Sequence, residues 1–567
     1  MSDSNKAINR RDLMKAASVL GVGALAVGPH GVAAAEAGTP THWDAVADVV
    51  VLGFGGAGAT SAITAHDAGA NVVILEKQGA ANHIPNTRMA GGIYHCPAKD
   101  GDRDALKQYA IAMMSGDNLP GRLEGEESDV VDGLASVWAS DTPTVNDFLH
   151  SVDPDLKPLH AGGAGFPKFP GAQAAKYQTY LSTYTGKIDL TVPTKNLPKL
   201  QKTSGESFFA ALATGVQNRK IRVLYNTPAE SLVMNGRVVI GVRATRSGKP
   251  YTIKARRAVI ITTGGYEYNP AMRGAFLEGP GVKGWAFWGT PANTGDGIAM
   301  AMSAGAGLAR IASAAGGLSP TVPLPGYPNT NISVGHAGST PNSMIVDQYG
   351  NRYTNESEVT DDPNRYYFYN KAIEFDVETL TWPYAPSWAI FDETSRANAT
   401  IANMGFGAVG MGMVPWTKDN MDAVNRGWIL KADTIEGLAA QINAHPLNVS
   451  LMTVDTLTKS VNRFNTLCTK GKDDDFNRSA STLGPVAKAP FYAILMCVGG
   501  PNTKGGIAAN AKREAIDWMD RPIPRLYTAG EVSSVFKAVY QAGGNLTECI
   551  VFGRVAGRNA AAQKPWG

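Results

Sequence analysis

The stretch ADVVVLGFGGAGATSAITAHDAGANVVILEK, residues 47–77, has the pattern of a strand, a tight turn, a helix and a second strand. Its opening run of valines is short and β-branched, as is typical of a buried parallel strand. Gly53, Gly55 and Gly58 follow with the spacing G-x-G-x-x-G. In this spacing the first glycine permits the turn, the second lets backbone approach a pyrophosphate, and the third lets the helix pack against the strand. The stretch therefore predicts a dinucleotide-binding β-α-β unit.

The residues around this turn can supply the contacts that a dinucleotide needs. The N-terminus of the predicted helix, at Gly56 and Ala57, offers unpaired N–H groups and a partial positive charge to the pyrophosphate. Glu76 ends the second strand, where a carboxylate can accept hydrogen bonds from both ribose hydroxyls, and Lys77 follows it. The strand, the helix and the acid together argue against a chance match, but they do not distinguish FAD from NAD.

The N-terminus carries the pattern of an export signal. NRRDLMK, residues 9–15, precedes an apolar run rich in alanine and glycine over residues 16–28 and then the stretch VAAAEAG. A twin-arginine pair, a short apolar region and a small-residue cleavage site predict a twin-arginine signal over residues 1–35. The alternative is a surface Arg-Arg pair before an ordinary helix. Export would place the mature protein in the periplasm or at the cell surface.

Composition limits the classes of function. The chain of 567 residues is 44% hydrophobic and 18% charged, which suits a globular protein with a large core. Its net charge of +3 does not indicate a polybasic surface for nucleic acid. The four cysteines have no C-x-x-C spacing and the nine histidines no H-x-x-x-H pair, so the sequence predicts neither a metal site nor covalent haem.

Three later stretches extend the dinucleotide-binding pattern along the chain. NTRMAGG, residues 86–92, follows the second strand, and residues 223–265 have the pattern of a strand meander that ends in AVIITTGG. PIPRLYTAGEVSS, residues 522–534, has the pattern of a short strand followed by an acid. In this order the motifs resemble the fumarate reductase and 3-ketosteroid dehydrogenase superfamily of flavoproteins, from about residue 47 to about residue 562. The resemblance implies that the cofactor is non-covalent FAD.

The resemblance also assigns cofactor contacts to residues of this sequence. Glu76 would hold the adenosine ribose and Glu531 the ribityl or phosphate end, while the helix after Gly544 would direct its N-terminus at the pyrimidine edge of the flavin. Asp296 would lie in the turn under the flavin, unless it simply caps a helix. The implied cofactor-binding residues are Gly53, Gly55, Gly56, Ala57, Gly58, Glu76, Lys77, Asn86, Thr87, Gly91, Gly92, Gly264, Gly265, Asp296, Gly530, Glu531, Asn545 and Leu546.

The same resemblance predicts a mixed α/β (α+β) fold, in which a Rossmann-like FAD-binding domain carries an inserted substrate-capping domain. The first part of the FAD-binding domain would span residues 44–278, with a mostly helical insertion at about 100–205. Residues 279–433, rich in Trp, Tyr, Pro and Gly, would form the capping domain, and residues 434–567 would return to the FAD-binding domain.

The positions that hold cations in the fumarate-reducing branch carry other residues here. The histidine that precedes T-x-G-G in that branch falls at Pro501 and Asn502. Its proton-donating arginine falls at about Thr360, and its second substrate arginine at Tyr540. A dicarboxylate would lose charge-assisted hydrogen bonds of about 1.5–3 kcal/mol each. The sequence therefore argues against fumarate and against small dianionic substrates.

The 3-ketosteroid branch gives a closer match. Its motif places a tyrosine four residues before a glycine, as Tyr540 and Gly544 stand in VYQAGGN. In that branch the phenol O–H and the glycine N–H donate together to the C3 carbonyl of the substrate. Such a pair is an oxyanion hole, with two donors directed at the place where negative charge grows as the α-carbon is deprotonated.

The resemblance further implies a tyrosine base from the capping domain. NRYTNESEVTDDPNRYYFYN, residues 351–370, has a threonine in the expected place and tyrosines only after an apparent insertion. Tyr367 is the first candidate and Tyr366 the second, and Tyr369 stays open. A phenol has an ordinary pKa of about 10, so this base would need a second hydroxyl or a positive neighbour. The tyrosines considered for that relay are Tyr177, Tyr180 and Tyr184.

The predicted function is that of an exported FAD-dependent 3-oxosteroid Δ1-dehydrogenase, which removes an α-proton with a tyrosine and passes a β-hydride to flavin N5. The first alternative is a respiratory ene reductase that acts on an enone or enoate, and the second is a flavin-binding protein without enzymatic activity. Expected partners are a small hydrophobic, steroid-like ketone or an enoate, and an external electron acceptor or donor that is a quinone or a redox protein. Peripheral membrane association is left open, and no nucleic acid is expected.

Overall fold

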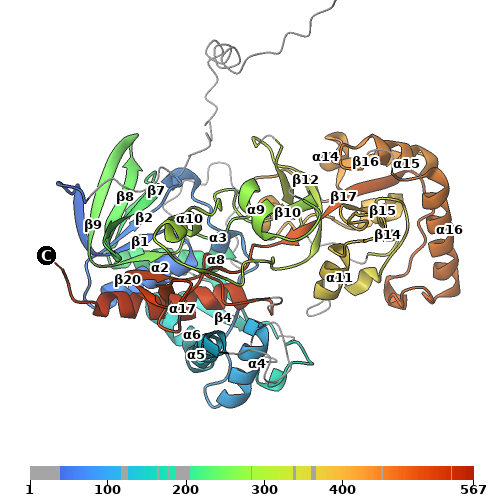
Figure 1. Cartoon of the computed structure of the whole chain (residues 1–567). Coiled ribbons are helices and arrows are strands. Elements are labelled where there is room, and N and C mark those ends of the chain that lie inside the picture. Colours follow the sequence, from blue (N-terminus) through green and yellow to red (C-terminus); the bar gives the residue numbers. More distant parts are fainter. Residues whose placement is uncertain are drawn as a thin grey trace, which may run out of the picture. The chain divides into compact units, whose positions relative to one another are not determined.

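Two large β-sheets, of eight and seven strands, form the framework of this computed structural model (Figure 1). The structure describes residues 39–115, 125–162, 165–175, 179–185, 205–281, 284–327, 329–335, 340–358, 365–448, 451–537, 539 and 541–566. The twin-arginine signal expected over residues 1–35 lies outside the described residues.

The first sheet contains the predicted dinucleotide-binding unit. β1 is buried from Ala47 to Leu52, which explains the unbroken apolar sequence of this central strand. Five parallel strands run in the order β20-β9-β1-β2-β6. Their bounds are Ala45–Leu52 for β1, Val72–Leu75 for β2, Arg222–Leu224 for β6, Lys249–Ile261 for β9 and Pro522–Thr528 for β20.

Antiparallel strands extend this sheet on one side. β7 (Ala229–Asn235) and β8 (Val238–Arg246) form a hairpin, and β8 pairs with β9. β19 (Glu514–Ile516) pairs with β20. The strand meander predicted over residues 223–265 is therefore confirmed.

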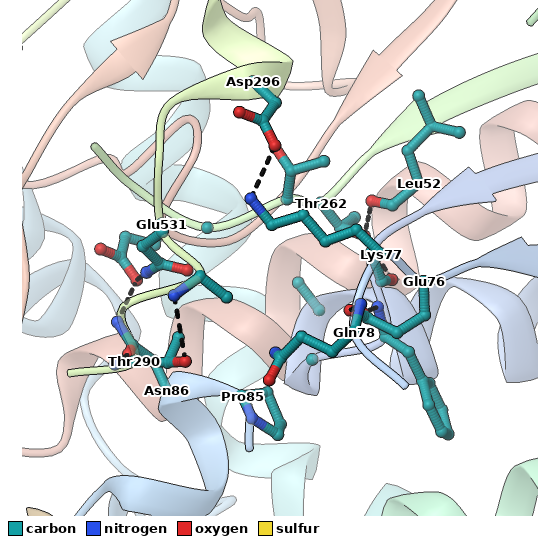
Figure 2. Close-up of a pocket in the computed structure, with 18 of the residues that line it drawn as sticks. Leu52, Glu76, Lys77, Gln78, Pro85, Asn86, Thr262, Thr290, Asp296 and Glu531 are labelled. Carbon is teal, nitrogen blue, oxygen red and sulfur yellow. Dashed lines mark hydrogen bonds and ion pairs between the residues drawn. The ribbon is translucent and has the colours of Figure 1, made fainter. Parts of the chain in front are cut away.

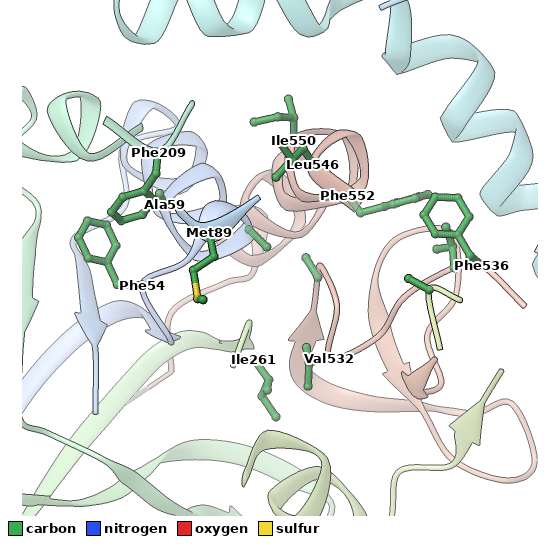
Figure 3. Packing of buried hydrophobic residues seen from close by; sticks show 14 of the residues in the cluster. Phe54, Ala59, Met89, Phe209, Ile261, Val532, Phe536, Leu546, Ile550 and Phe552 are labelled. Carbon is green, nitrogen blue, oxygen red and sulfur yellow. The ribbon is translucent and has the colours of Figure 1, made fainter. Parts of the chain in front are cut away.

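Two helices from opposite ends of the chain pack against each other beside this sheet. They are α2 (Gly56–Asp67) and α17 (Gly544–Ala562). Glycines allow the close contact, since a Cβ atom at Gly557 would lie 2.5 Å from the Ser61 carbonyl oxygen. Apolar side chains from these helices, from β9 and from nearby loops form the core that Figure 3 shows, and the labelled ones include Ala59, Ile261, Leu546, Ile550 and Phe552.

The insertion after β3 (Ile93–His95) contains both helices and strands. Its described helices are α4 (Arg103–Ser115), α5 (Gly125–Asp141), α6 (Val145–Val152) and α7 (Ala172–Ala175). Strands β4 (Leu156–His160) and β5 (Thr179–Tyr184) pair with each other, and β5 also pairs with β3. α8 (Gly205–Asn218) then leads back to β6.

The second sheet is formed mainly by the later half of the chain. Six strands run in the order β10-β13-β12-β17-β15-β14, and β16 also pairs with β17. Their bounds are Trp285–Phe287 for β10, Leu318–Pro323 for β12, Asn331–Ser333 for β13, Ser343–Val346 for β14, Ser387–Asp392 for β15, Ile429–Ala432 for β16 and Phe491–Gly500 for β17.

The same part of the chain also forms helices, several of which lie beside this sheet (Figure 1). They are α11 (Arg365–Ala372), α12 (Glu393–Asn398), α13 (Gly407–Gly410), α14 (Met421–Asn425), α15 (Ile435–Ala444) and α16 (Val454–Lys470). Shorter elements between the sheets are α3 (Asn86–Met89), α9 (Pro270–Phe276), α10 (Asp296–Ser303) and the strand pair β11 (Leu308–Ala309) with β18 (Gly506–Ile507).

The second sheet extends beyond the boundary expected at residue 433. β17 pairs with β12, β15 and β16, so the chain stays in this sheet until Gly500. α16 buries Leu457, Val461 and Phe464 in the same apolar cluster as Trp388 of β15. The expected boundary followed a change in composition, whereas the membership of a strand is decided by long-range pairing. The return to the first sheet therefore begins later, with β19 rather than at residue 434.

Among the helices that the structure describes, none is both long and apolar enough to cross a bilayer.

Candidate active site

A first pocket lies at the carboxyl ends of the central parallel strands, where α/β sheets bind ligands (Figure 2). Its empty volume is about 770 Å³, part of it open to solvent. The residues that line it include these predicted contacts: Gly53, Gly55, Gly56, Ala57, Glu76, Lys77, Asn86, Thr87, Gly264, Asp296 and Glu531.

The turn between β1 and α2 presents backbone to this pocket. Gly55 caps α2 without a side-chain hydrogen bond, and the Gly56 N–H donates to Thr87 Oγ1 at 2.8 Å. A Cβ atom at Gly56 would lie 2.9 Å from that oxygen, so the close approach of Thr87 requires glycine. The helix N-terminus therefore faces the pocket with its partial positive charge, which suits a pyrophosphate.

Glu76 is held as a buried carboxylate at one end of the first pocket. Its Oε2 accepts from the Phe54 N–H at 2.9 Å and its Oε1 from the Gln78 N–H at 2.7 Å. Burial raises the pKa of Glu76, but His83, whose Nε2 lies 3.6 Å from Oε2, and the two backbone N–H groups outweigh burial and hold the pKa below its ordinary value. Each oxygen keeps a further lone pair that a ribose hydroxyl can use.

Lys77 and Asp296 form an ion pair beside the same pocket. Lys77 Nζ lies 2.7 Å from Asp296 Oδ2, as Figure 2 shows. It also donates to Thr294 Oγ1 at 2.7 Å. The cap of α10 is Gly295, in a left-handed conformation, and not Asp296. The alternative that Asp296 merely caps a helix is therefore wrong, and its carboxylate lies on the pocket wall instead.

A second pocket continues from the first. The two share Asn86, Thr87, Glu531 and Cys549, so they form one groove. The empty volume of the second pocket is about 880 Å³, again partly open to solvent. Of the predicted residues, it adds Gly91, Gly92, Asn545 and Leu546 to the lining. Gly543 also lines it as the cap of α17, so a second helix N-terminus faces the groove.

Three predicted glycines line neither of these two pockets. A Cβ atom at Gly58 would lie 2.0 Å from the Gly53 carbonyl oxygen, which confirms the predicted packing role of this glycine. At Gly265 it would lie 2.2 Å from Thr503 Oγ1, and at Gly530 2.7 Å from Ala57 Cβ. These glycines let neighbouring groups approach, and they position the groove rather than contact its contents.

The structure differs from the expectation for Gly544. Its N–H donates to the Gln541 carbonyl oxygen at 2.9 Å, within the turn that starts α17. Gly543, with φ of 95°, reverses the chain here and creates this hydrogen bond. The Gly544 N–H is therefore already used and is not a donor to a substrate in this conformation.

The structure describes the tyrosines expected to act in catalysis to different extents. Tyr540 and Tyr177 lie outside the described residues, and Tyr366 and Tyr367 lie on α11 with side chains that are not described. Tyr369 is 3% exposed, and burial raises its pKa well above the ordinary value, which fits a core residue rather than a base.

Two tyrosines considered for the relay lie in the small sheet of the insertion. Tyr184 donates to Asp153 Oδ2 at 2.8 Å, and burial raises its pKa to about 12. Tyr180 stacks on Tyr94, with ring centroids 6.1 Å apart. Neither lines the two pockets of the groove, so the structure does not bring them to the site.

The second pocket is apolar and acidic. Its described lining contains no lysine, arginine or histidine, and it contains the carboxyl groups of Glu531 and Glu548. Pro501 and Asn502, which stand where the fumarate-reducing branch has a histidine, both line it. Trp288 and Phe406 contribute aromatic walls, with ring centroids 5.4 Å apart and planes at 85°.

Several residues at the groove were not among those predicted. The sequence gives a weak indication of Glu267 and Glu548, because they lie close to glycines that were predicted to belong to the site. Glu267 stands two residues after Gly265, and Glu548 four residues after Gly544. The sequence gives no such indication of Asn293, Trp288 or Phe406, because only tertiary folding brings these residues to the groove.

Comparison with known proteins agrees with this geometry. A model of the family described as "FAD binding domain" matches residues 48–546. The chain belongs to this FAD-binding family. It is therefore an FAD-dependent oxidoreductase, and its fold is that of the 3-ketosteroid dehydrogenases and fumarate reductases.

Individual relatives are similar over most of their length. A 3-oxosteroid 1-dehydrogenase of Mycolicibacterium smegmatis is 30% identical over 91% of this chain and 97% of the relative. A urocanate reductase of Eggerthella lenta is 27% identical over 91% of this chain and 74% of the relative. The crystal structure of 3-ketosteroid Δ1-dehydrogenase from Sterolibacterium denitrificans, in complex with 1,4-androstadiene-3,17-dione, has a TM-score of 0.71 at 23% identity and covers 91% of this chain and 99% of that structure.

The residues that line the groove suit FAD. Glu76 would hold the ribose, the N-terminus of α2 would face the pyrophosphate, and the N-terminus of α17 would face the flavin. Both helix termini favour negative charge, on the pyrophosphate and on a reduced flavin respectively. When bound, FAD supplies the redox chemistry by accepting or donating a hydride.

Two glycines of the β1–α2 turn should fail in different ways when replaced. Gly55→Val should fold, because the backbone is extended there and the nearest protein atoms to an added Cβ lie 3.7 and 3.8 Å away. It should lose FAD, since the new side chain would occupy the pyrophosphate position. Gly58→Ala should be destabilised by about 1–3 kcal/mol through overpacking against Gly53.

The ratio of flavin to protein absorbance and the thermal unfolding of the flavin-free proteins separate these outcomes. Full flavin occupancy in Gly55→Val would contradict the placement of the pyrophosphate.

Glu548 should make stability depend on pH. Burial raises its pKa to about 7, although the Val535 N–H and Arg513 act in the opposite direction. Between about pH 4.5 and pH 7 the folded protein keeps a proton that the unfolded chain releases, so stability falls as pH rises, by up to about 3 kcal/mol. Glu548→Gln, which is neutral at every pH, should flatten this dependence in urea unfolding. An unchanged pH profile in the variant would contradict the assignment.

Proposed function

We propose that the protein dehydrogenates a CH–CH bond beside the ketone of a neutral, steroid-like substrate. The observation that carries this proposal is the part of the second pocket outside the predicted FAD contacts, where Trp288 and Phe406 form aromatic walls beside Pro501 and Asn502 and no cation is described. A dicarboxylate there would lie near Glu548 without a charged partner, which costs several kcal/mol. A neutral ketone avoids this cost.

The similarity to known enzymes supports the same substrate class. The relative that is 30% identical over nearly its whole length is a 3-oxosteroid 1-dehydrogenase. The spacing of Tyr540 and Gly544 in this sequence matches the carbonyl-binding motif that the 3-ketosteroid branch uses.

The proposed chemistry places one tyrosine at the carbonyl and another at the α-proton. Tyr540 would donate its phenol O–H to the carbonyl oxygen, where negative charge grows during deprotonation. Tyr367, or Tyr366 beside it, would remove the α-proton, and the β-hydride would leave for the flavin. The Gly544 N–H could join Tyr540 only if the turn from Gln541 to Gly544 opened on substrate binding.

Gln541 would act as a positioning residue for Tyr540. Its side chain is 1% exposed, and its Oε1 accepts from the Tyr109 O–H at 3.2 Å. Ala542 in the same turn accepts from His95 Nε2 at 2.8 Å. These two contacts fix the turn that follows Tyr540 against the insertion and β3.

Replacing Tyr540 tests the carbonyl role. Tyr540→Phe keeps the ring but removes one donor, so turnover of 3-ketosteroids with an artificial electron acceptor should fall by roughly 10²–10³. Binding of the ketone in its ground state should weaken far less, because the donor matters most as enolate charge develops. Tyr109→Phe, which leaves Tyr540 unchanged, is the matched control and should lower turnover less. Turnover near the wild-type value in Tyr540→Phe would remove the proposed role.

A second candidate function is reduction of an enone or enoate by the same groove. The urocanate reductase that is 27% identical over 91% of this chain favours it. The direction would then be reversed, and reduced enzyme would be oxidised by the unsaturated substrate. In either direction we propose that electrons pass to or from an external quinone or redox protein.

We also propose that residues 1–35 export the folded protein by the twin-arginine route to the periplasm or cell surface. The pair Arg10 and Arg11 followed by a short apolar run supports this proposal. Replacing both arginines by lysine should leave the precursor in the cytoplasm, as measured by fractionation and immunoblotting. Unchanged export of the variant would contradict the proposal.

A further inference from the structure

Two buried carboxyl groups meet where the two pockets of the groove join. Glu267 follows β9 and is 0% exposed. Glu531 follows β20, and it lines both pockets. The two side chains come from the central parallel sheet, on loops that carry the predicted glycines Gly265 and Gly530.

The same two amide groups satisfy one oxygen of each acid. Asn86 Nδ2 donates to Glu267 Oε1 at 3.1 Å and to Glu531 Oε2 at 2.9 Å, and Figure 2 shows the second of these contacts. Asn293 Nδ2 donates to the same two oxygens, at 3.2 and 3.3 Å. The two carboxyl groups are thus held together on one side.

The other oxygen of each acid has no donor among the described residues. These oxygens are Glu267 Oε2 and Glu531 Oε1, and both are buried. Both oxygens lie beside Gly265. A Cβ atom at Gly265 would lie 2.7 Å from Glu267 Oε2 and 2.3 Å from Glu531 Oε1. Two buried acceptors without a donor are unfavourable, because each has lost its hydrogen bonds to water and gained none.

We propose that Glu267 and Glu531 share one proton between Glu267 Oε2 and Glu531 Oε1, and that this proton is required for tight binding of FAD. One proton turns two unsatisfied acceptors into one hydrogen bond. It also leaves a single negative charge on the pair where two would repel each other. No covalent bond is made or broken, and the proposal does not depend on the identity of the substrate.

The charged and titratable groups around the pair favour retention of this proton. Burial raises the pKa of Glu267, and for Glu531 burial and then the charge of Glu267 raise the pKa well above its ordinary value. Glu548 of α17 adds negative charge on the same side. Among the described residues, the other titratable groups for which an interaction with the pair is established are Tyr266, Tyr268, Arg273 and Cys549, and Arg273 is the cation among these four.

The shared proton connects pH to cofactor binding. FAD brings a pyrophosphate with negative charge, so loss of the proton places a second anionic carboxylate in a groove that already holds an anion. Because the pKa of the pair is raised, the pair keeps its proton to a higher pH than ordinary carboxyl groups do. Above the pH at which this proton leaves, the affinity for FAD should fall by up to about tenfold for each pH unit, the limit for one coupled proton.

Infrared spectroscopy of the holoenzyme tests the proton directly. At about pH 8, where ordinary carboxyl groups are ionised, wild-type protein should show the carbonyl stretch of a protonated carboxyl, shifted in D₂O. Glu267→Gln should lose this band, whereas Glu548→Gln and the exposed control Glu436→Gln should keep it. If Glu267→Gln does not fold, Glu531→Gln should lose the same band. A band that survives both Glu267→Gln and Glu531→Gln would overturn the proposal.

Retention of FAD tests the consequence. Free flavin released from diluted holoenzyme is measured by fluorescence after ultrafiltration, between about pH 6 and pH 9. Wild-type protein should release more FAD as pH rises. Glu267→Gln should release a nearly constant amount, because its amide donates to Glu531 Oε1 at every pH. Equal pH dependence in the wild type and in Glu267→Gln would also overturn the proposal, whichever substrate the enzyme uses.

Discussion

The close contact between α2 and α17 is the constraint on which the rest of the structure depends. Gly557 lets α17 lie against α2, so segments far apart in the chain enclose one groove. The N-terminus of α2 faces one half of that groove, and the N-terminus of α17 faces the other. A single FAD molecule in this groove would therefore meet two helix termini that favour negative charge.

The side chains of the groove are mostly neutral or acidic, in contrast to the partial positive charge of the two helix termini. Apart from Lys77, which is paired with Asp296, the described lining of both pockets holds carboxyl and amide groups and no lysine, arginine or histidine. Backbone N–H groups and helix termini therefore have to hold the anionic cofactor. The groove therefore offers an anionic substrate few cationic groups, which favours a neutral ketone as the proposed substrate. For the same reason, the proposed shared proton on Glu267 and Glu531 would lower the negative charge of the groove.

The sequence predicts those parts of the site that local geometry determines. Gly53, Gly55, Gly58 and Glu76 could be assigned because a turn and two neighbouring strands fix their places. The end of the second sheet could not, since β17 joins it only by pairing with β12, β15 and β16. The hydrogen bond of the Gly544 N–H depends on the conformation of a single turn, and the pairing of Glu267 with Glu531 depends on two strands that are distant in sequence; residue spacing encodes neither.

We propose that oxidised flavin in this groove takes a hydride from a neutral 3-oxosteroid. Anaerobic stopped-flow mixing of the oxidised holoenzyme with a saturated-A-ring or 4-ene 3-oxosteroid, followed by flavin absorbance and product analysis, tests this most directly. We expect bleaching of the flavin in a single turnover and a product with one more carbon–carbon double bond beside the ketone. A flavin that stays oxidised with every 3-oxosteroid, while the reduced enzyme is rapidly reoxidised by fumarate, would contradict it.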